Sequence, residues 1–214
     1  MISSLAGWLE ESRRLGFLGP GPIEPHLHHA LAFASVVDVP PARALDLGAG
    51  GGLPGLVLAV ERWPDTHWTF LDAQQKRTDF LERAVRALGL DRRIEVLTGR
   101  AELVAREATH RGAYELVVAR SFGPPAVAAE CAAGFLTAAG ALVVSEPPPS
   151  PGEVRWPTVG LAELGYAPAR EVVIADDDAD EPVHLVRLDR VALASERYPR
   201  RDGVPTKRPV FGPS

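Results

Sequence analysis

Five glycines between positions 48 and 55 constrain this chain more than any other feature. They follow a short apolar run at residues 42–47, which predicts a buried strand, and they surround Pro54, a residue that suits the first turn of a helix. Glycine adopts backbone angles that other residues avoid and lets another molecule approach the main chain. The stretch 44–55 therefore predicts a strand, a loop and a helix around a nucleotide-type ligand, or else a glycine turn that holds no ligand.

Two spacings in this loop indicate two different ligands. Gly50, Gly52 and Gly55 fit the pattern G-x-G-x-x-G, in which the pyrophosphate of a dinucleotide lies at a helix N-terminus. If the strand ends at Leu47, however, the third glycine is out of place, and the pattern becomes D-x-G-x-G starting at Asp46. A carboxylate there would repel a pyrophosphate and accept hydrogen bonds from a cationic amino-acid ligand such as S-adenosylmethionine. We therefore favour an S-adenosylmethionine loop over that of a nicotinamide-dependent oxidoreductase.

Composition narrows the class of protein. A chain of 214 residues fits one domain, and shares of 46% hydrophobic and 24% charged residues are typical of globular proteins. The net charge of -5 argues against a generally basic surface but leaves room for a local basic patch. Cys131 is the only cysteine, so we expect a core residue and no disulfide or thiolate zinc site. Without a signal peptide or a membrane-spanning segment, we expect a cytoplasmic protein that does not contact membranes.

Strand and helix patterns alternate after residue 42. We expect strands at residues 42–47, 68–71, 94–97, 116–119 and 141–144, a hairpin at 172–174 and 183–188, and helices from about residue 53 and at 75–88 and 125–136. This alternation predicts an α/β fold with a mostly parallel sheet and helices on both faces. We expect a helical cap at residues 1–39, a main domain at 40–195, and a basic tail at 196–214 that packs on this domain or extends from it.

Charged residues follow the expected strands, where ligands of parallel sheets collect. Asp72 follows the second strand and is placed to hold both ribose hydroxyls of an adenosine, to cap the next helix, or to do both. Glu102, beyond the third strand, is placed to meet an adenine edge. Arg120, after the fourth strand, is placed to meet a phosphate or the carboxylate of the cofactor. For Glu102 and Arg120 the alternative is an ordinary salt bridge within a loop.

The tail is the one basic region. Residues 196–214 hold five basic and two acidic side chains, a net charge of +3 in an acidic chain, together with Tyr198 and Phe211. This pattern predicts contacts with phosphates and bases, or else a merely solvated C-terminus. We expect no metal site, because the spacing of His26, His28 and His29 does not gather three ligands on one helix face. The acids at 176–181 favour a solvated turn over a calcium loop.

Several segments together resemble the GidB-type methyltransferases, which methylate N7 of a guanine in small-subunit ribosomal RNA. They are residues 46–55, 71–72, 80–81, 100–102, 119–122 and 197–200. The resemblance extends from about residue 24 to residue 211, and its most specific part is residues 197–209. It implies a class I S-adenosylmethionine-dependent methyltransferase fold, which is Rossmann-like with a mostly parallel seven-stranded sheet.

The same resemblance implies S-adenosylmethionine as cofactor and 16S ribosomal RNA as partner of a monomeric enzyme. The residues implied to hold the cofactor are Asp46, Gly48, Ala49, Gly50, Leu53, Asp72, Ala101, Glu102 and Arg120. Those implied to hold RNA are Arg120, Arg197, Arg200, Arg201 and Lys207. No catalytic general base is expected, because guanine N7 carries an in-plane lone pair and loses no proton when it is methylated.

One segment departs from the family pattern. Residues 145–147 are Ser-Glu-Pro where family members commonly have a lysine-glycine pair. A glutamate in place of a lysine reverses the sign of the local field near the expected substrate entrance. The alternative is therefore a cofactor-binding relative that has a different substrate or does not methylate ribosomal RNA.

Overall fold

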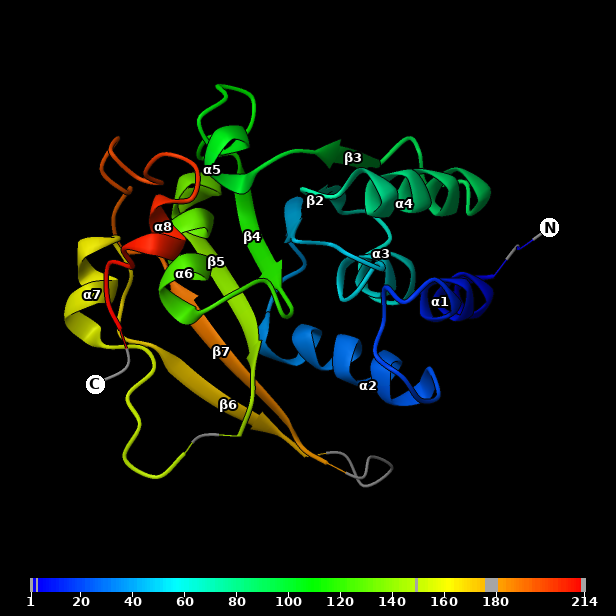
Figure 1. Cartoon of the computed structure of the whole chain (residues 1–214), viewed down its shortest axis with the longest axis horizontal. Coiled ribbons are helices and arrows are strands. Elements are labelled where there is room, and N and C mark those ends of the chain that lie inside the picture. The colour runs from blue at the N-terminus through cyan, green and yellow to red at the C-terminus, as the bar shows by residue number, and fades with distance from the viewer. Residues whose placement is uncertain (1, 3, 149, 176–180, 213–214) are drawn as a thin grey trace.

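The computed structural model describes residues 2, 4–148, 150–175 and 181–212, and these residues build one seven-stranded sheet between two layers of helices (Figure 1). The strands are β1 (Arg43–Leu47), β2 (His67–Asp72), β3 (Ile94–Thr98), β4 (Tyr114–Ala119), β5 (Leu136–Glu146), β6 (Arg170–Ile174) and β7 (Val183–Asp189). The helices are α1 (Leu5–Arg14), α2 (Glu24–Ala32), the 3-10 helix η1 (Phe33–Val36), α3 (Gly55–Glu61), α4 (Gln75–Ala87), α5 (Ala101–Val104), α6 (Pro125–Phe135), α7 (Thr158–Glu163) and α8 (Val204–Lys207).

The strand order places the candidate site. The order is β3-β2-β1-β4-β5-β7-β6, in which β1 to β5 are parallel and β7 runs antiparallel to both β5 and β6. The chain runs outward from β1 to β3 and then returns to place β4 on the other side of β1. Ligands of parallel sheets bind at such a reversal, beyond the carboxyl ends of the two strands. The mostly parallel α/β sheet expected from the sequence is confirmed, and the glycine loop after β1 lies at the reversal.

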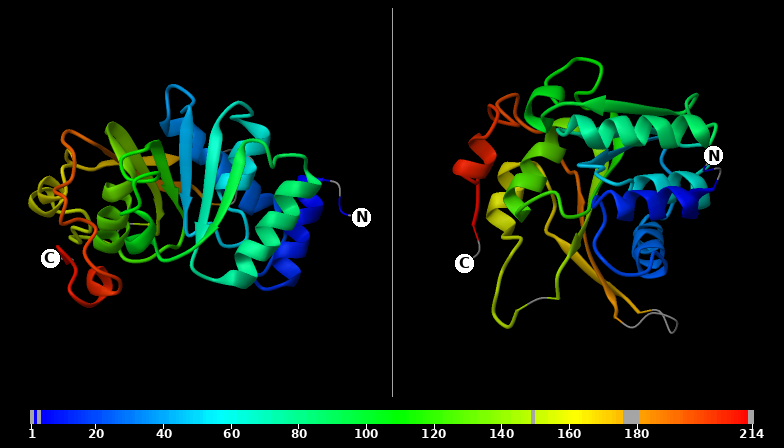
Figure 2. Two further views of the ribbon diagram at one scale, coloured as in Figure 1. Left: turned by 90° about the horizontal axis from the view of Figure 1, so that it is seen from above. Right: turned by 45° about the vertical axis from the view of Figure 1, so that its right-hand side comes forward.

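Alternating side chains on the strands form two cores. Leu116 and Val118 of β4 belong to the core beneath α1 to α4, whereas Val117 and Ala119 belong to the core beneath α5 to α7. This alternation is the two-residue period of a strand whose two faces are both covered. Figure 2 shows the two helix layers on opposite sides of the sheet.

The N-terminal helices belong to the first core. Leu9 of α1 is fully buried in one cluster with Leu56 of α3 and Phe80 of α4. Ser12, also fully buried, donates a hydrogen bond of 3.0 Å to the carbonyl of Gly51. The segment expected as a helical cap is therefore tied directly to the glycine loop.

The C-terminal segment packs on the other helix layer. Tyr198 is 3% exposed in the second core, and Phe211 lies against Gly160 of α7. Residues 204–207 of this segment form the short helix α8 although they include a proline. Pro205 lies in the first turn of α8, where the amide that proline lacks would have no intrahelical acceptor.

Two further boundaries differ from the expectation. Helix α3 begins at Gly55, with Pro54 as its N-cap, rather than near Leu53. Strand β5 is longer than residues 141–144, because Leu136 already pairs with Tyr114 across a register shift. The expected hairpin is present as the antiparallel pair β6 and β7, while the acids at 176–180 lie outside the described residues.

We expect Gly134→Ala to lower the free energy of unfolding by about 1 kcal/mol or more. A Cβ at position 134 would lie 2.5 Å from Cδ of Pro199 and 2.9 Å from Cβ of Ala105, so the segment or α6 must shift. Overpacking of this kind costs about 1–3 kcal/mol and at a rigid ring exceeds the roughly 1 kcal/mol that alanine gains in a helix. Urea unfolding followed by circular dichroism measures the effect.

Gly212→Ala is the matched control, because a Cβ there meets no heavy atom within 4 Å. Equal unfolding midpoints for Gly134→Ala and the unsubstituted protein would contradict the docking of Pro199 on α6.

Candidate active site

The glycine loop is held across the end of β2 by its own backbone. The amides of Gly48 and Ala49 donate to the carbonyl of Leu71 at 2.8 and 2.9 Å. Gly48 has a φ of 75°, and a Cβ on it would lie 2.6 Å from the ring of Phe122. Only glycine has both this backbone conformation and the space for the ring, so this position requires glycine, as the sequence predicted for the loop.

Asp46 joins the end of β1 to the start of α3. Its side chain is fully buried, and Oδ2 accepts a hydrogen bond of 2.7 Å from the amide of Gly55. Burial raises the pKa of this carboxyl to about 7, an effect that the Gly55 bond only partly opposes. Oδ1 is buried without a hydrogen-bond partner among the described residues. The structure thus gives Asp46 an internal partner on one oxygen and leaves one acceptor for a ligand or a water.

Asp72 has partners on both oxygens. Oδ1 accepts from the amide of Gln74 at 2.8 Å, and Oδ2 accepts from the amide of Gly50 at 3.0 Å and lies 3.4 Å from Arg77. Gln74, not Asp72, is the N-cap residue of α4, so the capping alternative for Asp72 is wrong. The carboxylate, 5% exposed, holds the glycine loop and lines a cavity at the same time.

A cavity of about 230 Å³ opens at the reversal of strand order. Of the residues expected to hold the cofactor, it is lined by Gly48, Asp72, Ala101 and Glu102. Ala49, Gly50 and Leu53 do not line it, since the first two act through backbone bonds and Leu53 is buried in the core. Lining residues that sequence reasoning missed include Ala73, Gln74, Arg77, Arg100, Ser121, Phe122 and Thr206. The first four directly follow β2 and β3 or lie just beyond, a position that could have signalled them.

The C-terminal segment closes one side of this first cavity. Glu102 is 2% exposed, and its Oε1 accepts from Arg100 at 3.3 Å and from the amide of Gly203 at 3.1 Å. Arg100 in turn donates to Asp202 at 3.0 Å. Thr206, three residues beyond Gly203, lines the cavity. A tail for which only RNA contacts were expected therefore also lines the first cavity.

Arg120 lies in a second cavity of about 390 Å³ beside the first. Its Nη2 lies 3.0 Å from Nδ1 of His26, and burial lowers its pKa although Asp46 opposes the shift. Burial and the charge of Arg120 lower the pKa of His29 to about 4, so this ring is neutral beside the guanidinium. Neither cavity is isolated, because Ser121 and Phe122 line both.

Ser121 has a strained backbone at this boundary. Its φ of 55° makes it the one non-glycine residue with a positive φ among the described residues. Serine avoids this region unless the surrounding structure imposes it, and such strain clusters at functional sites. Ser121 is therefore held in this conformation by the structure around it, at the boundary of the two cavities.

The basic residues expected to bind RNA fall into two groups. Arg200 donates to the fully buried carboxylate of Glu130 through Nε at 2.9 Å and Nη2 at 2.6 Å. Arg197 bonds Glu163 at 2.5 Å and lies over the ring of Tyr198. Both guanidinium groups hold the segment to the domain.

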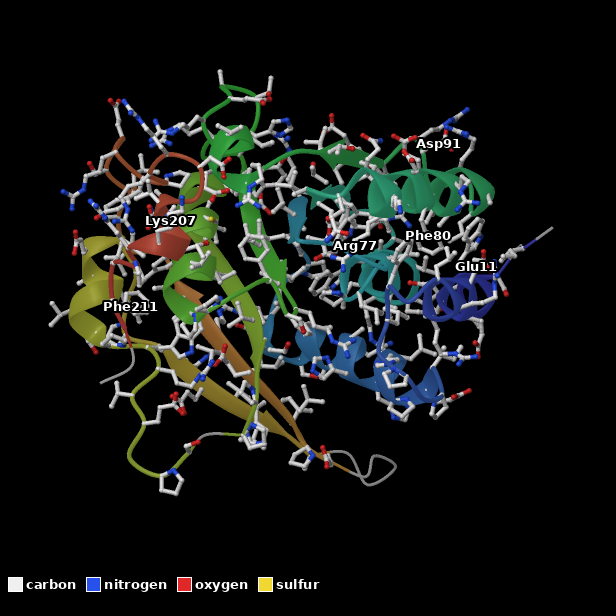
Figure 3. All side chains as sticks on the ribbon, viewed as in Figure 1. Glu11, Arg77, Phe80, Asp91, Lys207 and Phe211 are labelled. Atoms are coloured by element: carbon white, nitrogen blue, oxygen red, sulfur yellow. The ribbon has the colours of Figure 1, made fainter. Side chains whose placement is uncertain are left out.

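Arg201 and Lys207 are exposed to solvent like Arg197, but neither makes a salt bridge with another described residue. Figure 3 shows Lys207 at α8, on the side of the sheet opposite Arg77 and α4. The sequence does not distinguish these two residues from Arg197 and Arg200, which differ from them only through their partners.

The structure also describes the lone cysteine and the chain's potential for metal and membrane binding. Cys131 is fully buried and lines the first cavity, and burial raises the pKa of its thiol, which keeps it protonated. The described residues contain no group of three or more histidine, cysteine, aspartate or glutamate side chains able to hold a metal ion. Across residues 4–148, 150–175 and 181–212, no helix has the length and apolar character needed to cross a membrane.

The first cavity fits the S-adenosylmethionine expected from the sequence. Asp72 supplies a carboxylate for the ribose hydroxyls, and Gly48 supplies a bare backbone that a side chain cannot cover. Asp46 does not line this cavity, but its buried Oδ1, which has no hydrogen-bond partner among the described residues, is an acceptor at the start of the same loop. The first turn of α5 leaves the amides of Ala101 and Glu102 without intrahelical acceptors, as in every helix. These donors and acceptors match an adenosine that carries an amino acid.

Known proteins are similar to this chain in sequence and in fold. The GidB family model, described as rRNA small subunit methyltransferase G, matches residues 22–146. A protein named ribosomal RNA small subunit methyltransferase G from Moorella thermoacetica is 31% identical over 86% of this chain and 77% of its own length. A protein of the same name from Rubrobacter xylanophilus is 35% identical over 87% of this chain and 73% of its own length.

A solved structure described as a predicted O-methyltransferase from Agrobacterium tumefaciens superimposes with a TM-score of 0.56. It is 22% identical, and the match covers 77% of this chain and 82% of that one. At this identity the likeness concerns the fold alone. The class I methyltransferase fold expected from the sequence is confirmed.

We expect Asp72→Ala to weaken binding of S-adenosylhomocysteine at least tenfold. The buried ribose hydroxyls would lose a charged acceptor worth roughly 1.5–3 kcal/mol, and the loop would lose its bond from Gly50. Asp72→Asn keeps the shape and one acceptor, so its loss should be smaller. Isothermal titration calorimetry measures the three affinities.

Asp79→Asn is the control, since Asp79 is exposed on α4 and bonds only Gln75. Tight binding of NADH together with no response to S-adenosylhomocysteine would contradict the cofactor assignment.

Proposed function

This chain belongs to the GidB family of rRNA small subunit methyltransferases, which use S-adenosylmethionine, and we propose that it methylates N7 of a guanine in 16S ribosomal RNA. The observation that carries the proposal is the junction of two cavities at Ser121 and Phe122. The first cavity has the groups that suit the cofactor, and the second offers room for a base next to it.

The reaction needs positioning more than proton transfer. When bound, S-adenosylmethionine supplies a methyl group on a positively charged sulfur. The lone pair of guanine N7 forms the new bond to the methyl carbon, and the electron pair of the broken carbon–sulfur bond stays with sulfur. The positive charge moves to the base and no proton leaves. Holding the two partners in line therefore supplies several kcal/mol of the catalytic effect. This agrees with the expectation that the reaction needs no general base.

The residues of the junction have distinct roles in this proposal. Gly48 and Asp72 hold the cofactor from the side of β1 and β2, and Glu102 holds it from the side of α5. Phe122, whose ring lies against Gly48, separates the two cavities and is available to stack on a base. Arg120 lines only the second cavity, so we assign it to the RNA rather than to the cofactor.

The C-terminal segment serves both structure and RNA binding in this proposal. Arg197 and Arg200 hold the segment through Glu163 and Glu130. The exposed Arg201, Lys207 and Arg208 are then the residues that contact phosphates. We also propose the division into a cap at residues 1–39, a domain at 40–195 and a tail at 196–214, and a monomer that acts in the cytoplasm, where ribosomal RNA is found.

The surroundings of Glu146 bear on the alternative that this chain is a relative with a different substrate. That alternative depends on Glu146, whose negative charge replaces the positive charge common in the family. Glu146 forms a salt bridge with Arg155, which also bonds Glu153 at 3.2 Å. Because a cation accompanies the glutamate, the local field is not simply reversed, and this favours ribosomal RNA as the substrate.

We expect N7-methylguanine to disappear from one position of 16S ribosomal RNA when the gene is deleted, and to return when it is restored. Mass spectrometry of RNA fragments from the two strains measures the mark. A mark that persists unchanged after deletion would favour the alternative of a different substrate.

We expect neutralisation of Arg201, Lys207 and Arg208 to glutamine to flatten the salt dependence of RNA binding. Each phosphate contact with single-stranded RNA contributes a log–log slope of about -0.7, so losing three contacts removes roughly 2. Filter binding at several salt concentrations measures the slope. Unlike removal of residues 196–214, these substitutions retain Tyr198 and Thr206, which the core and the first cavity need.

The control neutralises Arg62, Arg86 and Arg92, which are exposed on the α3 and α4 side of the molecule (Figure 1). A slope that changes equally in both triple variants would show that only net charge matters, against a role of the C-terminal segment.

A further inference from the structure

The second cavity contains one acidic side chain among the described residues that line it, and this side chain is Glu146 at the end of β5. The side chain of Glu146 is 11% exposed. Its Oε2 accepts from Arg155, and no hydrogen bond to Oε1 is present within the described residues. Oε1 is therefore open to a donor, and Oε2, which Arg155 holds in place, keeps a second lone pair for another donor.

A guanine that is to be methylated at N7 cannot be recognised at N7. Its remaining polar edge carries, in order, the acceptor O6, the donor N1–H and the donor N2–H₂, and the last two point in the same direction. Two parallel donors match one carboxylate, as an arginine fork does. Adenine presents a lone pair at N1 and no amino group at C2, so the same carboxylate would repel it. An acidic acceptor away from the cofactor can therefore select guanine over adenine.

The groups that follow β1, β4 and β5 have the same order in the sheet as the polar atoms along the edge of guanine. β4 lies between β1 and β5 in the sheet. The glycine loop follows β1, Arg120 follows β4, and Glu146 ends β5. Along guanine the order is N7, O6 and then N1 with N2. Arg120 has a buried Nη1 without a hydrogen-bond partner among the described residues, a donor suited to O6.

We propose that Glu146 accepts hydrogen bonds from N1–H and N2–H₂ of the target guanine, and that Arg120 donates to O6. This inference rests on the proposed function, and it makes Glu146 the residue that selects guanine over adenine. Glu146 stands where the family commonly has a lysine, and a carboxylate has an advantage there. The base gains a positive charge on methylation, and a carboxylate stabilises that charge. Arg155 keeps the carboxylate oriented in the absence of RNA.

The test combines a change in the base with a change in the protein. Inosine lacks N2–H₂ but keeps N1–H, O6 and N7, so an RNA fragment is prepared with either guanine or inosine at the target position. We expect kcat/KM of the unsubstituted protein to fall roughly tenfold or more with inosine, because a buried carboxylate loses a donor. With Glu146→Ala, and with Glu146→Gln as a second variant of similar shape, the two RNAs should react within about twofold of each other.

Glu153→Gln is the matched control, since it removes the other carboxylate that contacts Arg155 and does not line the second cavity. It should keep the tenfold preference for guanine. Calorimetry with S-adenosylhomocysteine shows whether each variant still folds around the cofactor, and equal affinities are expected.

Three results would overturn the inference. Equal rates of the unsubstituted protein on guanine and inosine would remove its basis without touching the proposed function. The same guanine preference in Glu146→Ala as in the unsubstituted protein would assign selection to another residue. No methyl transfer to either RNA would overturn the proposed function together with this inference.

Discussion

Two buried carboxylates hold the glycine loop on which the site depends. Asp46 accepts from the amide of Gly55, and Asp72 accepts from the amide of Gly50. A loop with five glycines loses much conformational freedom when it is ordered, so it needs such bonds to keep one shape. Once the loop is held, its outer side contacts Ser12 of α1 and its inner side contacts Phe122. The N-terminal helices and the segment after β4 are thereby placed around the same ligand.

A second pair of acidic residues joins the C-terminal segment to the domain. Glu130 is fully buried, and a buried carboxylate is costly unless it is paired and hydrogen-bonded. Arg200 satisfies it with its guanidinium and its backbone amide. Glu102 does the same at the cavity by accepting from Gly203. The segment that carries the exposed cations is therefore tied by hydrogen bonds to a residue that lines the first cavity.

The substrate side of the site is built from charges that balance one another. Arg120 lies near the buried Asp46 and beside two histidines, and burial lowers its pKa and that of His29. Glu146, which lines the same cavity, is paired with Arg155. A purine between them meets a cation at one end and a carboxylate at the other. This arrangement suits a neutral base that becomes a cation in the reaction.

The sequence by itself determined the strand, loop and helix around residues 44–55, the alternating α/β pattern and the acidic residue at the end of β2. These features follow from local periodicity and from the backbone angles that glycine allows. Both depend only on residues that are close together in the chain. Only the tertiary structure decided that Arg200 is paired and Arg201 exposed, that Thr206 lines the cofactor cavity, and that Arg155 accompanies Glu146. Arg200 and Glu130 are 70 residues apart in the chain. The state of a charge depends on its burial and its partner, and both are set by contacts between distant segments that no local pattern records.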